Sequence, residues 1–276
     1  MLKQRILTAL VLAPLAIAAI LLLPTGGFAL LIAAMSLQAM WEWSRLAGVR
    51  SQPIRIAILA ATALLLALLW MIRDEPVAWV VVGAGLVWWA LSLAWLARLS
   101  WGAAPTPGNA GWKMLAGAFA VLPAWLALVV LHGQAPNGHA WALLAVLLVW
   151  SADTGAYFAG RRFGTTKLAP RVSPNKTRAG AWGALVVAGA VALAGGWLLG
   201  ARGAALAGVI VVALLTVLAS ILGDLVESLL KRQANVKDSG ALFPGHGGLL
   251  DRVDSVFSAM PVFVAGKALL DLFTPT

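Results

Sequence analysis

Long runs of apolar residues recur along the whole chain, and they constrain its fold more than any other feature. Each run is about 20 residues long, which lets an α-helix cross a hydrocarbon core of roughly 30 Å. Of the 276 residues, 62% are hydrophobic and only 11% are charged. The short alternating segments of a transmembrane β-barrel are absent from the sequence. The sequence therefore predicts an all-α integral membrane protein, built as a polytopic bundle.

Turn signals such as Pro24-Thr25-Gly26 divide these runs into nine predicted transmembrane helices. The helices are expected at 6–23, 27–47, 54–72, 77–97, 113–131, 140–160, 180–199, 203–230 and 253–273. The basic N-terminus resembles a signal peptide, but its apolar run is too long for one, so we expect an uncleaved helix. We divide the chain into N-terminal transmembrane helices, 1–139, and a C-terminal transmembrane region, 140–276, where the candidate catalytic residues described below lie.

The basic residues of the loops predict an orientation. With nine helices, seventeen Lys and Arg residues fall on one side of the membrane and two, Arg73 and Arg202, on the other. Such residues collect in cytoplasmic loops, so we expect a cytoplasmic N-terminus and an external C-terminus in the inner (cytoplasmic) membrane. The net charge of +10 then needs no nucleic-acid partner. The long polar loops 161–179 and 231–252 are expected to carry function on the cytoplasmic side.

Half of the ten acidic residues lie in one short stretch, at Asp224, Glu227, Asp238, Asp251 and Asp254. Asp224 and Glu227 share a helix face with Ser228 and Lys231, while Asp251 and Asp254 share a face of the next helix. If the two helices are antiparallel neighbours, these faces meet at the cytoplasmic edge of the bilayer. Clustered carboxylates repel one another, and Mg²⁺ with its hard oxygen ligands would neutralise them. Salt bridges between the helices, to Lys231 or Arg252, are the alternative.

The loop between these helices has the composition of a phosphate-binding segment. Gly240, Gly245, Gly247 and Gly248 allow main-chain amides to approach an anion, and a helix N-terminus follows. The nearby basic residues are Lys231, Arg232, Lys237 and Arg252. Acids that hold a metal beside groups that hold phosphate are typical of phosphoryl or nucleotidyl transfer. A plain flexible loop is the alternative.

Residues outside this stretch supply further candidates. Asp153 lies inside a predicted transmembrane helix, where an acid is either functional or paired with an arginine. Ser173, Lys176 and Thr177 offer hydroxyls and an ammonium group in a predicted turn before helix 180–199, and these groups suit phosphate. We interpret His132 and His139 as structural, Glu42 as a local partner of Arg45, and Lys267 as a partner of Asp271.

The C-terminal motifs resemble the signature of the phosphatidate cytidylyltransferase (CDP-diacylglycerol synthase) family. The matching stretches are Ser228-Leu-Leu-Lys231-Arg232, Lys237-Asp238-Ser-Gly240, Pro244-Gly-His246-Gly247-Gly248 and Asp251-Arg252-Val-Asp254. Two upstream stretches, from Asp153 to Tyr157 and from Ser173 to Thr177, are also similar to the family. The resemblance covers about 150–258, and the helices before it are similar only in being apolar.

The resemblance implies an enzyme that converts CTP and phosphatidate, a membrane lipid, to CDP-diacylglycerol and pyrophosphate with Mg²⁺, the use of a second cation staying open. It implies Asp224 and Asp251 as metal ligands, and Asp224, Asp251, Lys237 and His246 as catalytic residues. The residues expected to bind substrate are Ser173, Lys176, Thr177, Glu227, Ser228, Lys231, Arg232, Asp238, Gly247, Gly248, Arg252 and Asp254, with Asp153 as a further candidate. Whether the protein forms a homo-oligomer stays open.

Two other functions are less consistent with the sequence. The sequence lacks the spaced Asp pattern of CDP-alcohol phosphotransferases. A transporter that binds an ion at Asp153 and Asp224 would be expected to show repeated halves and broken helices at the bilayer midplane. Here the acids cluster at one end of their helices and no repeat is seen.

Overall fold

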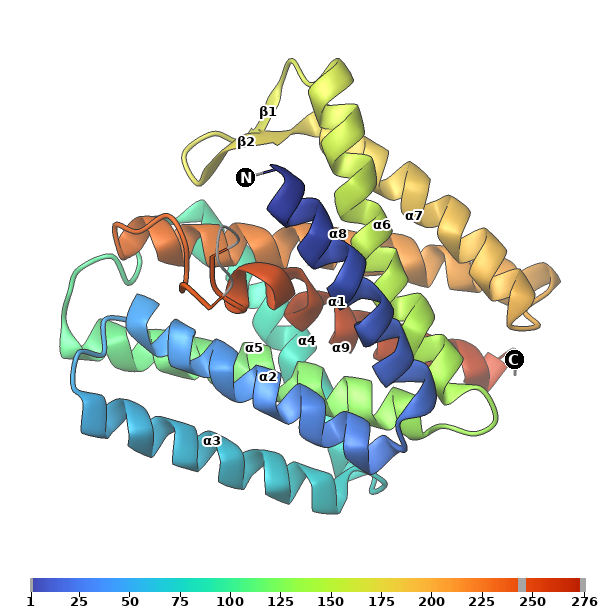
Figure 1. Ribbon diagram of the computed structural model, residues 1–276, viewed down its shortest axis with the longest axis horizontal. Coiled ribbons are helices and arrows are strands. Elements are labelled where there is room, and N and C mark those ends of the chain that lie inside the picture. The colour runs from blue at the N-terminus through green and yellow to red at the C-terminus, as the bar shows by residue number, and fades with distance from the viewer. Residues whose placement is uncertain (1, 243–246, 274–276) are drawn as a thin grey trace.

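Helices form almost all of the structure, a computed structural model that describes residues 2–242 and 247–273. The described residues contain the nine expected helices and one small hairpin (Figure 1). The helices are α1 (Leu2–Leu22), α2 (Thr25–Leu46), α3 (Gln52–Ile72), α4 (Val77–Ala97), α5 (Pro107–Gly133), α6 (Gly138–Phe163), α7 (Arg178–Leu198), α8 (Gly203–Gln233) and α9 (Leu250–Phe273). The strands are β1 (Lys167–Ala169) and β2 (Ser173–Thr177).

Seven of the described helices, α3 to α9, are long and apolar enough to cross a membrane. Helix α1 contains a shorter apolar stretch, Val11–Leu22, and α2 carries the polar side chains of Gln38, Glu42 and Arg45. The predicted class, a polytopic helical membrane protein, is therefore confirmed. The number of nine spans and the orientation stay predictions.

Helix α5 starts at Pro107, six residues before its predicted start at 113. The Thr106 side chain accepts a hydrogen bond from the Asn109 amide at 3.2 Å, which satisfies a free donor of the first turn. Pro107 occupies the first helical position, where its fixed φ angle fits and no amide hydrogen is needed. The sequence Pro105-Thr106-Pro107-Gly108, whose composition is typical of a turn, thus contains the start of the helix.

The predicted turn at Ser173–Thr177 is wrong, because these residues form strand β2. It pairs antiparallel with β1, with Lys167 opposite Thr177 and Ala169 opposite Ser173. At the last residue of the strand, the Thr177 hydroxyl accepts a hydrogen bond from the Gly180 amide at 3.1 Å and caps α7. The hairpin and the cap together fix where Lys176 lies.

Helices α8 and α9 lie between two groups of helices (Figure 1). On one side, α6 and α7 form a hairpin with β1 and β2 at its end, and α7 packs against α8. On the other side, α4 and α5 pack against α9, and α2 packs against α5. Residues from 140 onward therefore contact the earlier helices extensively, mainly through α9.

Two structural predictions from the sequence are confirmed. Lys267 Nζ lies 2.6 Å from both carboxylate oxygens of Asp271 within α9. The His132 ring contacts the Ile20 carbonyl through Nε2 at 2.9 Å and stacks on the rings of Phe28 and His139. These groups are used in packing at the ends of helices.

Candidate active site

A glycine on α8 allows α9 to approach closely where the acidic residues lie. A Cβ atom at Gly223 would lie 2.6 Å from the Asp254 carbonyl oxygen and would also collide with the Ser258 side chain. The residues that follow Gly223 on α8 include Asp224 and Glu227, and they face the first turns of α9. The polar faces of the two helices therefore meet, as the sequence predicted.

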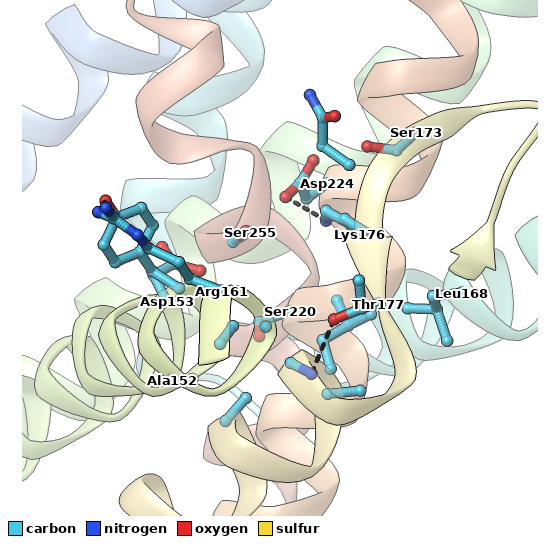
Figure 2. Close-up of a pocket in the computed structure, with 18 residues that line it drawn as sticks. Ala152, Asp153, Arg161, Leu168, Ser173, Lys176, Thr177, Ser220, Asp224 and Ser255 are labelled. Atoms are coloured by element: carbon cyan, nitrogen blue, oxygen red, sulfur yellow. Dashed lines mark hydrogen bonds and ion pairs between the residues drawn. The ribbon is translucent and has the colours of Figure 1, made fainter. Parts of the chain in front are cut away.

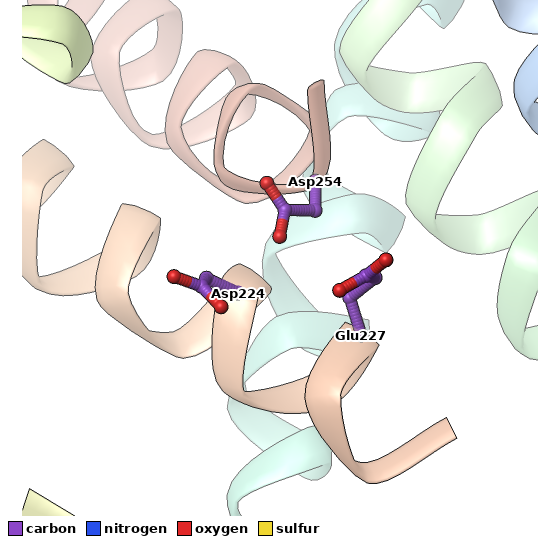
Figure 3. A group of neighbouring side chains, drawn as sticks. All are labelled: Asp224, Glu227 and Asp254. Atoms are coloured by element: carbon purple, nitrogen blue, oxygen red, sulfur yellow. The ribbon is translucent and has the colours of Figure 1, made fainter. Parts of the chain in front are cut away.

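Three carboxylates form a compact group at this contact (Figure 3). Asp224 and Glu227 from α8 and Asp254 from α9 place ligand oxygens within 4.8 Å of one another. Glu227 is only 1% exposed; its Oε2 is ion-paired with Lys231, while no hydrogen bond to its Oε1 is seen among the described residues. A buried carboxylate is costly unless a cation neutralises it.

Two lysines contribute positive charge to the group. Lys176 of β2 forms an ion pair with Asp224, and Lys231 of α8 forms an ion pair with Glu227. Lys231 Nζ also lies 2.7 Å from Asp251 Oδ1. The predicted alternative of salt bridging across the helices is thus present in part, because Lys231 connects α8 to Asp251 on α9.

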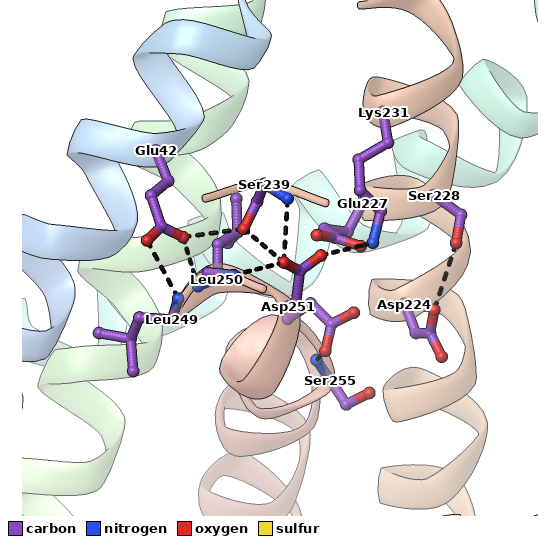
Figure 4. A network of polar contacts seen from close by, with 12 residues as sticks. Glu42, Asp224, Glu227, Ser228, Lys231, Ser239, Leu249, Leu250, Asp251 and Ser255 are labelled. Atoms are coloured by element: carbon purple, nitrogen blue, oxygen red, sulfur yellow. Dashed lines mark hydrogen bonds and ion pairs between the residues drawn. The ribbon is translucent and has the colours of Figure 1, made fainter. Parts of the chain in front are cut away.

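Asp251 shares Lys231 with Glu227 and lies in a network with the loop before α9 (Figure 4). Its Oδ2 accepts hydrogen bonds from the Ser239 amide at 2.9 Å, the Ser239 hydroxyl at 2.9 Å and the Gly248 amide at 2.8 Å. The acid of α9 that the structure groups with Asp224 is Asp254, and the predicted metal pair of Asp224 and Asp251 stays a prediction.

A pocket of about 550 Å³ opens next to the carboxylates (Figure 2). Asp153 of α6, Lys176 of β2 and Asp224 of α8 line it, with the hydroxyls of Ser220 and Ser255 nearby. Ala152, Ala156, Leu168, Ala181 and Ile221 are among its apolar lining residues. An apolar wall beside charged groups suits an amphipathic ligand.

The pocket contains Asp153 and several of the other residues that the sequence predicted to bind substrate. Asp153 is an exposed pocket residue, and Arg161 donates to the Tyr157 hydroxyl at 3.0 Å. Ser173 and Thr177 also line the pocket, and the Thr177 hydroxyl caps α7 as well. Asp153, Ser173 and Lys176 are thus brought together with Asp224.

The other predicted residues lie around this centre with various contacts. The Ser228 hydroxyl donates to Asp224 Oδ1 at 3.3 Å, and Arg232 Nε donates to the Val172 carbonyl at 3.2 Å. Lys237 and Asp238 are exposed in the loop, and Arg252 is exposed in the first turn of α9. Gly247 has a φ angle of +83°, a conformation that favours glycine. His246, predicted to be catalytic, lies outside the described residues.

Sequence reasoning missed Glu42 and Ser239. The predicted pair of Glu42 with Arg45 is wrong: Glu42 accepts hydrogen bonds from the loop and from the start of α9, while Arg45 donates to the Ser239 carbonyl. The only signal in the sequence was an acid near the end of a largely apolar helix.

The oxygen atoms of this group fit a hard divalent cation. Mg²⁺ prefers carboxylate and water oxygens, and it is bound through one or two carboxylates when a substrate phosphate supplies further ligands. The buried carboxylate of Glu227, with ligand oxygens of Asp224 and Asp254 within 4.8 Å, matches this chemistry. Lys176 is placed to bind an anion beside them.

Comparisons with known proteins agree with this chemistry. The cytidylyltransferase family matches residues 3–270. A phosphatidate cytidylyltransferase of Pseudomonas aeruginosa is 45% identical over 266 residues, which cover 96% of each chain. Another from Haemophilus influenzae is 35% identical over 95% of this chain and 97% of its own, and one from Bacillus subtilis is 46% identical over 45% of this chain and 46% of its own. The resemblance seen in the C-terminal motifs extends to the whole chain, and the chain belongs to the phosphatidate cytidylyltransferase family.

Proposed function

We propose that this chain transfers a cytidylyl group from CTP to phosphatidate, giving CDP-diacylglycerol and pyrophosphate. The observation that carries this proposal is the three-carboxylate group at the edge of a pocket that has both a lysine and apolar walls. The negative charges of a nucleoside triphosphate need cations nearby to neutralise them, and a lipid phosphate needs an apolar surface beside an anion site. The names of the relatives agree with this pairing of substrates.

Different residues of the site would bind the metal and the phosphate groups in this reaction. Asp224, Glu227 and Asp254 would hold Mg²⁺, which supplies charge neutralisation to the triphosphate. Lys176 is placed to neutralise a phosphate in the pocket, with Ser173 beside it. A phosphatidate oxygen attacks the α-phosphorus, the bond from that phosphorus to the bridging oxygen of the β-phosphate breaks, and pyrophosphate leaves with the electron pair. No protein nucleophile is needed, because the lipid phosphate is already an anion.

We further propose that the pocket faces the cytoplasm of the inner membrane, with the N-terminus on the same side and the C-terminus outside. The support is the charge asymmetry of the loops: seventeen Lys and Arg residues lie on the predicted cytoplasmic side and two on the opposite side. The hairpin of β1 and β2, which borders the pocket, belongs to one of these basic loops.

The proposal is tested with the purified protein in detergent, phosphatidate, Mg²⁺ and CTP labelled at the α-phosphate. Label is expected in the lipid with the wild type and is expected to be lost with Asp224→Asn. Glu75→Gln, which changes an exposed acid in the loop before α4, is the matched control and should retain activity. No labelled lipid from folded wild-type protein would contradict the proposed reaction.

A further inference from the structure

Glu42 is a buried acid of α2 that belongs to neither the pocket nor the three-carboxylate group. It is 3% exposed, and both of its oxygens accept hydrogen bonds (Figure 4). Oε1 accepts from the Leu249 amide at 3.0 Å and from the Gln38 side chain at 2.8 Å. Oε2 accepts from the Leu250 amide at 2.8 Å and from the Ser239 hydroxyl at 2.8 Å. Two backbone amides, the Gln38 side-chain amide and a hydroxyl whose single proton is shared with Asp251 surround this buried carboxylate.

Two of these donors are at the start of α9. The first amides of a helix have no partner within the helix, and they carry the positive end of its dipole. Here the cap comes from a residue more than two hundred positions earlier in the chain, through Leu249 and Leu250. Glu42 therefore fixes where α9 begins, and Asp251 and Asp254 are in the first turns of that helix.

Ser239 connects Glu42 to Asp251. Its hydroxyl lies 2.8 Å from Glu42 Oε2 and 2.9 Å from Asp251 Oδ2, and its amide donates to the same Asp251 oxygen at 2.9 Å. Arg45, one turn after Glu42 on α2, donates to the Ser239 carbonyl at 2.6 Å. Asp251 in turn binds Lys231, which pairs with Glu227 of the candidate metal group. A continuous set of contacts thus runs from α2 to the site.

The glycines of the loop fit around these carboxylates. A Cβ atom at Gly240 would lie 2.5 Å from Glu42 Oε1, and one at Gly248 would collide with Glu42 Oε2. A Cβ atom at Gly247 would lie 2.6 Å from Asp251 Oδ2. The sequence suggested that these glycines let the loop approach a phosphate. In the structure, the anions that they approach are Glu42 and Asp251.

We propose that Glu42 is a positioning residue for cytidylyl transfer: it holds Ser239 and the start of α9 so that Asp251, Lys231 and Asp254 keep their places in the site. The inference rests on the proposed function, since it assigns a role within that reaction. Glu42 touches none of the pocket residues through the contacts described, so it acts through Ser239 and the α9 amides.

The test compares wild type, Glu42→Gln and Arg45→Met as purified full-length proteins. In Glu42→Gln the new amide nitrogen is a donor facing other donors. Displacement of α9 by a fraction of an ångström is expected to lower kcat by about 10- to 100-fold, with KM for CTP changed by less than about threefold. Arg45→Met changes an exposed residue and should lower kcat in the same direction by a smaller factor.

Amide hydrogen exchange supplies a readout that does not depend on activity. Exchange at Ser239, Leu249 and Leu250 is expected to accelerate in Glu42→Gln by about tenfold or more, while α3 to α7 exchange as in the wild type. Faster local exchange with unchanged kcat in both variants would overturn the positioning role. Lower activity of Glu42→Gln with faster exchange in every helix, together with a fully active Arg45→Met, would indicate that Glu42 only supports folding in general. That result would also overturn the positioning role. Wild-type protein without transfer would instead reject the proposed function itself.

Discussion

Gly223→Ala is the perturbation that most directly tests how the packing of α8 and α9 builds the site. The new Cβ atom would lie 2.6 Å from the Asp254 carbonyl oxygen, whereas ordinary van der Waals contact begins at 3.4 Å. The helices must therefore separate by roughly 0.8 Å, because the neighbouring atom is backbone and cannot rotate away. Such overpacking costs about 1–3 kcal/mol of stability.

The same separation moves Asp254 away from Asp224 and Glu227. Misplacement by about 1 Å is expected to lower kcat by roughly 10- to 100-fold. The assay is label transfer from CTP to lipid, measured beside thermal unfolding in the same detergent. Gly83→Ala on α4 is the matched control, since a Cβ atom there meets nothing within 4 Å. If Gly223→Ala kept the activity and stability of Gly83→Ala, the reasoning from helix contact to site geometry would be refuted.

Three further substitutions follow from the contacts of the site. Lys176→Met should lower cytidylyl transfer by about 100-fold, because it removes the ammonium group from the pocket. Lys167→Met, on β1 of the same hairpin, is the control and should lower transfer by less than about threefold. Equal losses in the two variants would argue against a pocket role for Lys176. Asp254→Asn should raise the Mg²⁺ concentration needed for half-maximal activity by about tenfold or more, and should weaken Mn²⁺ binding, measured by electron paramagnetic resonance, by a similar factor. Asp271→Asn, near the end of α9, is the control. Unchanged Mn²⁺ binding in Asp254→Asn would remove Asp254 from the metal site. Thr177→Ala should lower the free energy of unfolding by about 0.5–2 kcal/mol through loss of the α7 cap, and Thr177→Ser should keep the wild-type stability. Equal stability of the wild type and both variants would show that the cap contributes nothing.

The helical membrane architecture could be predicted because apolar runs and their turn signals act locally. The face shared by Asp224, Glu227 and Lys231 could also be predicted, since it depends only on the helical period. The start of α5 was missed because Thr106 and Pro107 form a capping arrangement inside what reads as a turn. Strand β2 was missed because its pairing with three-residue β1 leaves no pattern in the sequence.

The assignment of the acids on α9 could not be made from sequence. Asp251 and Asp254 share a helix face, and only the loop decides that Ser239 and Gly248 bind Asp251 while Asp254 faces α8. The role of Glu42 depends on contacts across about 200 positions, which no local pattern records. Local periodicity therefore indicated where the candidate site lies, whereas the contacts of each residue within it depend on long-range packing.

The most direct measurement compares CTP labelled at the α-phosphate with CTP labelled at the γ-phosphate, using the same purified wild-type protein, phosphatidate and Mg²⁺. Cytidylyl transfer predicts label in the lipid from α-labelled CTP only, with the γ-label recovered in pyrophosphate. Label in the lipid from γ-labelled CTP would show phosphoryl transfer instead, and would contradict the proposed reaction.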